Sequence, residues 1–181
     1  MMTSTEIQQE AKRLRQEKKY DEALPLYEEL WNETGASFDG AGLLNCLRKL
    51  KQYDKAIPLA EKLVKKLPDF QWAKIEAIWT YIEGKLNKFE EDASVDEIIE
   101  IANGIMDLKP EGPAEKLAVF KVLKAAKASG DWKIVNEWSD KLNPEILSTT
   151  PMTDEEGREM KRAAEKIIAI RLAILNKIEA R

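Results

Sequence analysis

Apolar residues recur at intervals of three and four positions along almost the whole chain, and the alternation typical of strands is nearly absent. This spacing places apolar side chains on one face of an α-helix. Glycine, proline and short polar clusters interrupt the pattern and separate the helical segments. The pattern predicts an all-α protein with helices over residues 4–18, 21–34, 38–50, 54–67, 70–86, 95–108, 114–128, 132–142 and 153–180.

Part of this pattern is repeated along the chain. The stretch KKYDEALPLYEELW contains Tyr20, and KQYDKAIPLAEKLV, which contains Tyr53, aligns with it without gaps. Two fainter copies begin near Ser94 and Gly130, and residues 87–94 look like an insertion in the third unit. Repetition at this period is the sequence signature of arrays built from helical units.

The repeated unit resembles the tetratricopeptide repeat. An aromatic residue precedes the second helix, an alanine opens that helix and a proline follows it. The residues that carry this resemblance are Tyr20, Tyr53, Trp132, Ala23, Ala56, Pro68 and Pro110. The resemblance implies a right-handed α-solenoid of about four antiparallel helical hairpins over residues 1–145. A linker and a long C-terminal capping or interaction helix are expected over residues 146–181.

The repeated prolines need an explanation, because proline inside a helix removes a backbone hydrogen bond. Pro25 and Pro58 each lie four residues after an aspartate, Asp21 and Asp54. If these aspartates cap the second helix of each unit, the prolines fall near its first turn, where few N–H groups need a partner. We therefore expect these helices to begin near residues 22 and 55.

Charge is unevenly distributed between the helices. The chain has a net charge of −4, yet the first helix of each unit is net basic and the second helices together are net acidic. The resemblance implies that the first helices line one concave groove. Their outward faces carry basic and aromatic side chains together with one asparagine, and aromatic residues are typical interface anchors. The candidate partner-binding residues are Lys12, Arg15, Phe38, Asn45, Arg48, Lys49, Trp72, Trp79, Phe120, Lys121, Lys124 and Lys127.

These features favour a non-catalytic protein–protein interaction scaffold that binds an acidic or mixed peptide segment. Binding of single-stranded nucleic acid by the same face is an alternative, since basic residues interleaved with aromatics suit phosphates and bases. A second alternative is an oligomerisation or regulatory domain excised from a larger protein. In that case the helix over 153–180, which has two apolar stripes, would pair with its copy in a homodimer or dock onto another domain.

Several classes of function are disfavoured by residues that the sequence lacks. It contains no histidine, one cysteine (Cys46) and no glycine-rich phosphate loop, so we expect neither an enzyme nor a metal or cofactor site. No apolar run of about 18 residues is present, which argues against a membrane span. The N-terminal segment has no apolar core typical of a secretory signal, and we expect a cytoplasmic location.

Overall fold

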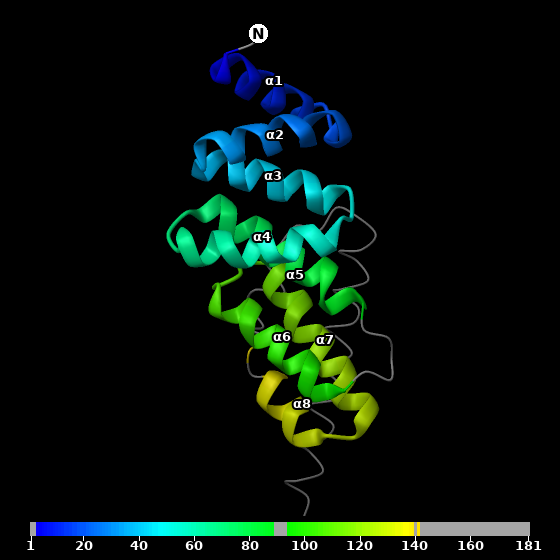
Figure 1. Cartoon of the computed structure of the whole chain (residues 1–181). Helices are drawn as coiled ribbons and strands as arrows, with labels where there is room; N and C mark the ends of the chain where they lie inside the picture. Colours follow the sequence, from blue (N-terminus) through cyan, green and yellow to red (C-terminus); the bar gives the residue numbers. More distant parts are fainter. Residues whose placement is uncertain (1–2, 89–93, 140, 142–181) are drawn as a thin grey trace, which may run out of the picture. The chain divides into compact units, whose positions relative to one another are not determined.

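The computed structural model describes residues 3–88, 94–139 and 141. Within these residues the chain is all-α, as the sequence predicts (Figure 1). The elements are α1 (Ser4–Gln16), α2 (Tyr20–Thr34), α3 (Ser37–Lys49), α4 (Tyr53–Lys66), α5 (Gln71–Gly84), the 3₁₀ helix η1 (Leu86–Lys88), α6 (Val95–Asp107), α7 (Pro113–Ser129) and α8 (Trp132–Ser139).

The first seven predicted helices are confirmed, with ends displaced by at most two residues. The helix predicted over 132–142 is confirmed over 132–139. The helix predicted over 153–180 and the segment 146–181 lie outside the described residues. None of the helices within the described ranges is long and apolar enough to cross a membrane.

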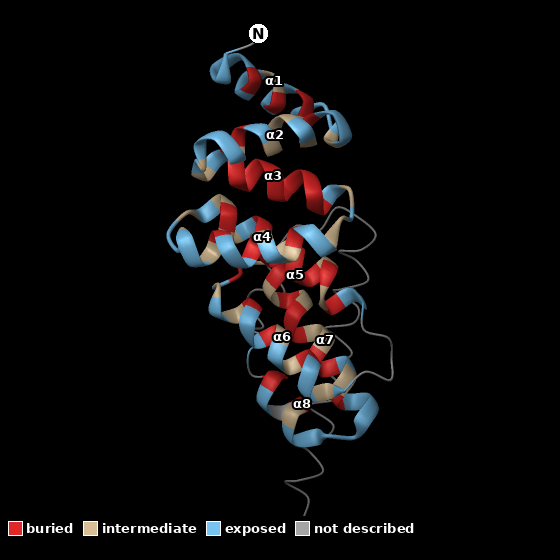
Figure 2. Cartoon of the chain, viewed as in Figure 1, coloured by how far each residue is buried: buried red, intermediate tan, exposed pale blue. Residues whose placement is uncertain are grey.

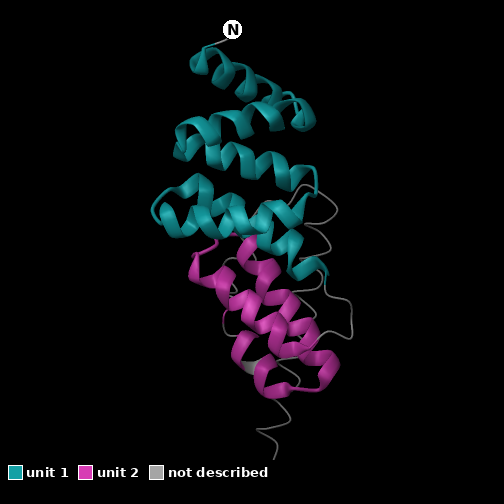
Figure 3. Ribbon diagram, viewed as in Figure 1, with its two compact units in different colours: residues 1–88 teal, residues 89–181 magenta. Residues whose placement is uncertain are grey.

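The chain divides into two compact units, residues 1–88 and 89–181 (Figure 3). In the first unit each helix packs against the next along the chain, and α3 also packs against α5. In the second unit α6 packs against α7, and α7 packs against α8.

The helix bounds match the repeat found in the sequence. The bounds of α1 and α3 differ by 33 residues at both ends, and α2 and α4 also begin 33 residues apart.

Helix α3 is the centre of the first unit. It is buried from Asp39 through Arg48, which Figure 2 shows as a nearly continuous red segment. Most surface helices bury only one stripe, but α3 contacts α1, α2, α4 and α5. Its Leu44 is fully buried, as are Leu30 of α2 and Leu63 of α4, and each such side chain contributes about 1.5–3 kcal/mol through burial.

Two glycines of α3 allow aromatic rings of α2 to approach closely. A Cβ at position 42 would lie 2.3 Å from Cε1 of Tyr27, and one at position 40 would lie 2.7 Å from Cζ3 of Trp31. Glycine in a helix interior costs roughly 0.5–1 kcal/mol relative to alanine. Close packing of Tyr27 on Gly42 explains why α3 carries such a residue despite this cost.

The predicted aspartate caps are wrong. Helices α2 and α4 begin at Tyr20 and Tyr53, and their N-cap residues, Lys19 and Gln52, make no side-chain capping hydrogen bond. The aspartates instead occupy the first turn, where a negative charge interacts favourably with the helix dipole.

Each proline is consequently the sixth residue of its helix and lies within it. Pro25 and Pro58 are exposed, as are the two aspartates one turn earlier. Because this side of each helix is exposed, water can reach the aspartate carbonyl that loses its intrahelical donor.

Candidate ligand-binding pocket

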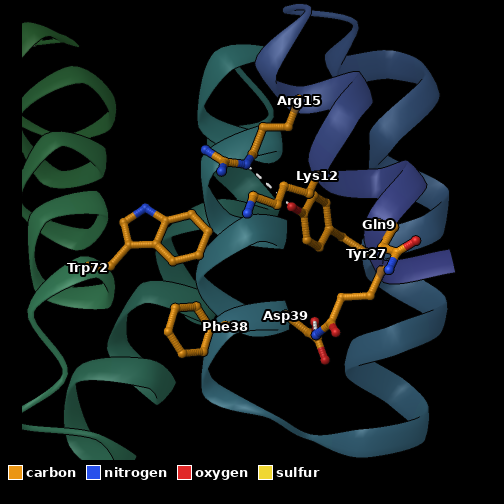
Figure 4. A pocket seen from close by; sticks show the side chains of 8 residues that line it. Gln9, Lys12, Arg15, Tyr27, Phe38, Asp39 and Trp72 are labelled. Carbon is orange, nitrogen blue, oxygen red and sulfur yellow. Dashed lines mark hydrogen bonds between the residues drawn. The ribbon is translucent and has the colours of Figure 1, made fainter. Parts of the chain in front are cut away.

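A pocket of about 620 Å³ opens on the first unit. Its side chains come from α1, α2, α3 and the start of α5, as Figure 4 shows. Pockets of this size are typical of ligand-binding sites in proteins. The lining residues are Gln8, Gln9, Lys12, Arg15, Tyr27, Phe38, Asp39 and Trp72.

Two cations of α1 face this pocket. Lys12 is exposed and Arg15 is half-buried, and neither forms an ion pair with any described residue. Arg15 is held in place by neutral groups. Its Nε donates to the hydroxyl of Tyr27 at 3.3 Å, and its guanidinium lies 4.8 Å from the ring centroid of Trp72. The pocket therefore carries positive charge that no described carboxylate neutralises by direct pairing.

Aromatic rings form the other wall of the pocket. Phe38 leaves 62% of its surface exposed, although it makes an edge contact with Phe70 at a centroid distance of 5.0 Å. Its centroid is 6.0 Å from that of Trp72. An exposed phenylalanine beside a half-buried tryptophan provides apolar surface on which a ligand side chain can pack.

The one carboxylate that lines the pocket is already satisfied. Asp39 is 1% exposed, and its two oxygens accept hydrogen bonds from Gln8 Nε2 at 3.0 Å and from the hydroxyl of Thr34 at 2.9 Å.

Burial raises the pKa of the Tyr27 phenol, an effect that the hydrogen bond from Arg15 partly opposes. Tyr27 therefore stays neutral at physiological pH.

A buried polar network includes the Trp72 indole and joins α5 to α3. Glu76 Oε1 accepts from Trp72 Nε1 at 3.2 Å and from Asn45 Nδ2 at 2.9 Å. Glu76 Oε2 accepts from Nε and Nη2 of Arg48 at 3.1 and 3.0 Å, while Arg48 Nη1 donates to Glu83 Oε1 at 2.6 Å. No buried side-chain polar atom within the described part of the chain lacks a partner. The hydrogen bond from its indole N–H joins Trp72 to this network.

The structure brings together four of the predicted site residues: Lys12, Arg15, Phe38 and Trp72. The outward position expected for Asn45 and Arg48 is wrong. Asn45 is only 7% exposed and Arg48 only 6%, and both side chains donate hydrogen bonds to the buried Glu76.

The remaining predicted residues lie outside this pocket. Lys49 is exposed at the last residue of α3, and Trp79 is half-buried on α5. On α7 of the second unit, Lys124 and Lys127 are exposed, whereas Phe120 and Lys121 are half-buried. Burial lowers the pKa of Lys121, and the charge of Lys124 adds to this effect. A single groove shared by all four first helices stays a prediction.

Sequence reasoning missed Gln8, Gln9, Tyr27 and Asp39 as lining residues, and it missed Glu76 as the partner of Arg48. The sequence does contain one signal for the hydrogen-bonded pairs within the protein. Gln8 and Asp39 are separated by 31 residues, as are Asn45 and Glu76, which is close to one repeat length. Complementary polar residues at this separation on successive first helices indicate contacts inside the protein.

Comparison with known proteins gives no match: no protein-family model, no curated protein and no solved structure matches the chain. Among the described residues, no group of three or more cysteine and acidic side chains could hold a metal ion. The candidate site therefore rests on the geometry and charge of the pocket itself.

Proposed function

We propose that this chain is a non-catalytic interaction module of the tetratricopeptide type, whose first unit binds an acidic or mixed peptide segment of a partner protein. One observation carries the proposal: the pocket places Lys12 and Arg15, which form no ion pair with any described residue, beside aromatic surface on Phe38 and Trp72. Such a surface combines charge-assisted hydrogen bonds with aromatic anchoring, the two contributions typical of strong peptide contacts.

The arrangement of the helices supports this class of protein. The 33-residue offset between α1 and α3 and the packing of α3 against α5 are what a stack of two-helix units requires. In such an array the hairpins are antiparallel, the superhelix is right-handed, and the first helices, α1, α3 and α5, line a concave surface. The pocket draws Lys12, Arg15, Phe38 and Trp72 from these three helices.

Selection of phage-displayed random dodecapeptides on the immobilised full chain tests the proposal. We expect the enriched peptides to contain acidic residues, because the pocket has an excess of positive charge. The same selection is run on a Lys12→Glu, Arg15→Glu double variant and on a Lys55→Glu, Lys62→Glu control, which changes charge equally at exposed positions of α4. Peptides that bind wild type and control but not the double variant support the proposal, and equal recovery on all three contradicts it.

Nucleic acid is tested with the same variants. Fluorescence anisotropy of a labelled oligothymidine at about 100 mM salt measures binding by phosphate contacts and base stacking. Arg15 already lies over the Trp72 ring and so reduces the ring surface that is open to a base. We therefore expect no binding of the oligothymidine at micromolar protein. Tight binding that is lost in the double variant would show that the ligand of this pocket is a nucleic acid and not a peptide.

A further inference from the structure

Two positions on α1 correspond to two positions on α3. Because the bounds of these helices differ by 33 residues at both ends, Lys12 corresponds to Asn45 and Arg15 corresponds to Arg48. Side chains three residues apart in a helix lie on the same face. Each helix therefore presents a pair of hydrogen-bond donors at the same place in its repeat.

On α3 this pair holds a carboxylate. Asn45 Nδ2 donates to one oxygen of Glu76 at 2.9 Å, and two nitrogens of Arg48 donate to the other oxygen at 3.0 and 3.1 Å. The side chains of Arg48 and Glu76 are only 7% and 8% exposed. A charged pair with so little contact with water is stable only when its hydrogen bonds are satisfied, as they are here.

On α1 the equivalent pair has no carboxylate. Helices α3 and α5 begin 34 residues apart, and the residues 34 positions before Glu76 and Glu83 are Gly42 and Lys49, neither of which is acidic. Within the described chain neither Lys12 nor Arg15 forms an ion pair, and Arg15 is held only by the Tyr27 hydroxyl and the Trp72 ring. One repeat therefore uses its donor pair to hold a carboxylate of the protein itself, whereas the donor pair of the preceding repeat faces a pocket.

We propose that the pocket binds the side-chain carboxylate of an aspartate or glutamate within a partner segment, held between Lys12 Nζ and the guanidinium of Arg15. This inference rests on the proposed function and names the group that is recognised. The carboxylate would meet a donor pair at the repeat position from which Asn45 and Arg48 hold Glu76. An apolar residue next to the acidic one would pack on Phe38, whose exposed ring lies on the same pocket. Charge complementarity and this apolar surface together favour a polypeptide over an isolated anion.

Blocked dipeptides test this proposal without a known partner. N-acetyl-Glu-Phe-amide carries one side-chain carboxylate, N-acetyl-Gln-Phe-amide carries none, and N-acetyl-Gln-Phe carries only a terminal carboxylate. Each is titrated to about 10 mM into ¹⁵N-labelled full chain. The signals followed are the Trp72 indole N–H and the Arg15 Nε–H, assigned with Trp72→Phe and Arg15→Lys variants. We expect saturable shifts with the Glu-Phe amide at about tenfold lower concentration than with the Gln-Phe amide, because charge-assisted hydrogen bonds are lost in the latter.

Two variants complete the test. Arg15→Gln removes the charge of the guanidinium. We expect it to abolish the preference for glutamate, with Lys55→Glu as the unaffected control. Thermal unfolding is measured first for both variants, so that a loss of preference is not caused by unfolding.

The outcomes separate this inference from the proposed function. Equal binding of both amides, or stronger binding of N-acetyl-Gln-Phe with its terminal carboxylate, would overturn the proposal that the pocket binds a side-chain carboxylate. Absence of any dipeptide shift would also overturn it, even where displayed dodecapeptides bind the pocket and so leave the proposed function standing. Absence of both dipeptide and dodecapeptide binding would overturn the two together.

Discussion

Trp72 and Glu76 are joined by a hydrogen bond of 3.2 Å from the indole Nε1 to the carboxylate Oε1. Trp72 lines the pocket, while Glu76 is buried and paired with Arg48 and Asn45. One residue of the pocket wall is thus hydrogen-bonded to a charged network whose other members do not line the pocket. This relationship ties the stability of the first unit to the shape of its candidate binding site.

Glu76→Gln should destabilise the first unit by roughly 1–3 kcal/mol, because Arg48 keeps its charge while losing its most buried ionic partner. Urea denaturation followed by circular dichroism measures the change. Glu61→Gln provides the matched control, since its carboxylate pairs with Lys85 at 3.0 Å with 57% of the side chain exposed, and such pairs contribute little. Equal effects of the two substitutions would show that the buried network does not hold α5 to α3.

Gly42→Ala should destabilise the protein, although alanine is the better helix former. The added Cβ would lie 2.3 Å from the Tyr27 ring, so α2 and α3 must separate or the ring must move. Gly104→Ala, in α6, is the control because no atom lies within 4 Å of its added Cβ. We expect Gly104→Ala to raise the unfolding free energy by about 0.5–1 kcal/mol. A gain in stability from both substitutions would contradict the close packing of Tyr27 on α3.

Stability should fall as pH rises above about 9. Burial raises the pKa of the Cys46 thiol from 9.0 to about 12 and that of the Tyr81 phenol from 10.0 to about 12. Since both groups are raised in the folded state, their contribution is complete below the unfolded pKa values and is lost as pH approaches 12. Urea midpoints measured at increasing pH test this, and Cys46→Ala should flatten the profile between pH 9 and 10. A midpoint that stays constant up to pH 11 would refute the burial of these groups.

Phe38→Ala should weaken binding of selected peptides by about tenfold or more while costing only about 0.5–1 kcal/mol of stability. The reason is that 62% of the Phe38 surface faces solvent and is free to contact a ligand. Ile75→Ala is the control, since Ile75 is 41% exposed on α5 but does not line the pocket. Isothermal titration of an enriched dodecapeptide measures both variants. If Ile75→Ala weakens binding as much as Phe38→Ala, the ligand lies outside this pocket.

The helices could be predicted from the sequence because their apolar spacing is local. The ends of the first seven were correct within two residues, and the 33-residue repeat placed α1 and α3 in register. The role of Asp21 and Asp54 as caps was predicted wrongly, because both aspartates lie in the first turn rather than before it. A local signature does not distinguish these two roles of an acidic residue.

The candidate site could be predicted only in part. Lys12 and Arg48 are both basic residues on a polar helix face, but one is exposed and the other is 6% exposed. The difference arises from the helix that follows one repeat later: α5 supplies Glu76 to Arg48, and nothing equivalent on α3 reaches Lys12. The residues on one face of a helix do not show which helix packs against that face. The exposure of these two basic side chains could therefore be determined only from the packed structure.

A crystal structure of the full chain with a dodecapeptide enriched by selection tests the central claim most directly. The account predicts that the peptide lies in the pocket of the first unit, with a carboxylate at hydrogen-bond distance from Lys12 or Arg15 and an apolar side chain against Phe38. A peptide bound elsewhere on the chain, with this pocket empty, would contradict it.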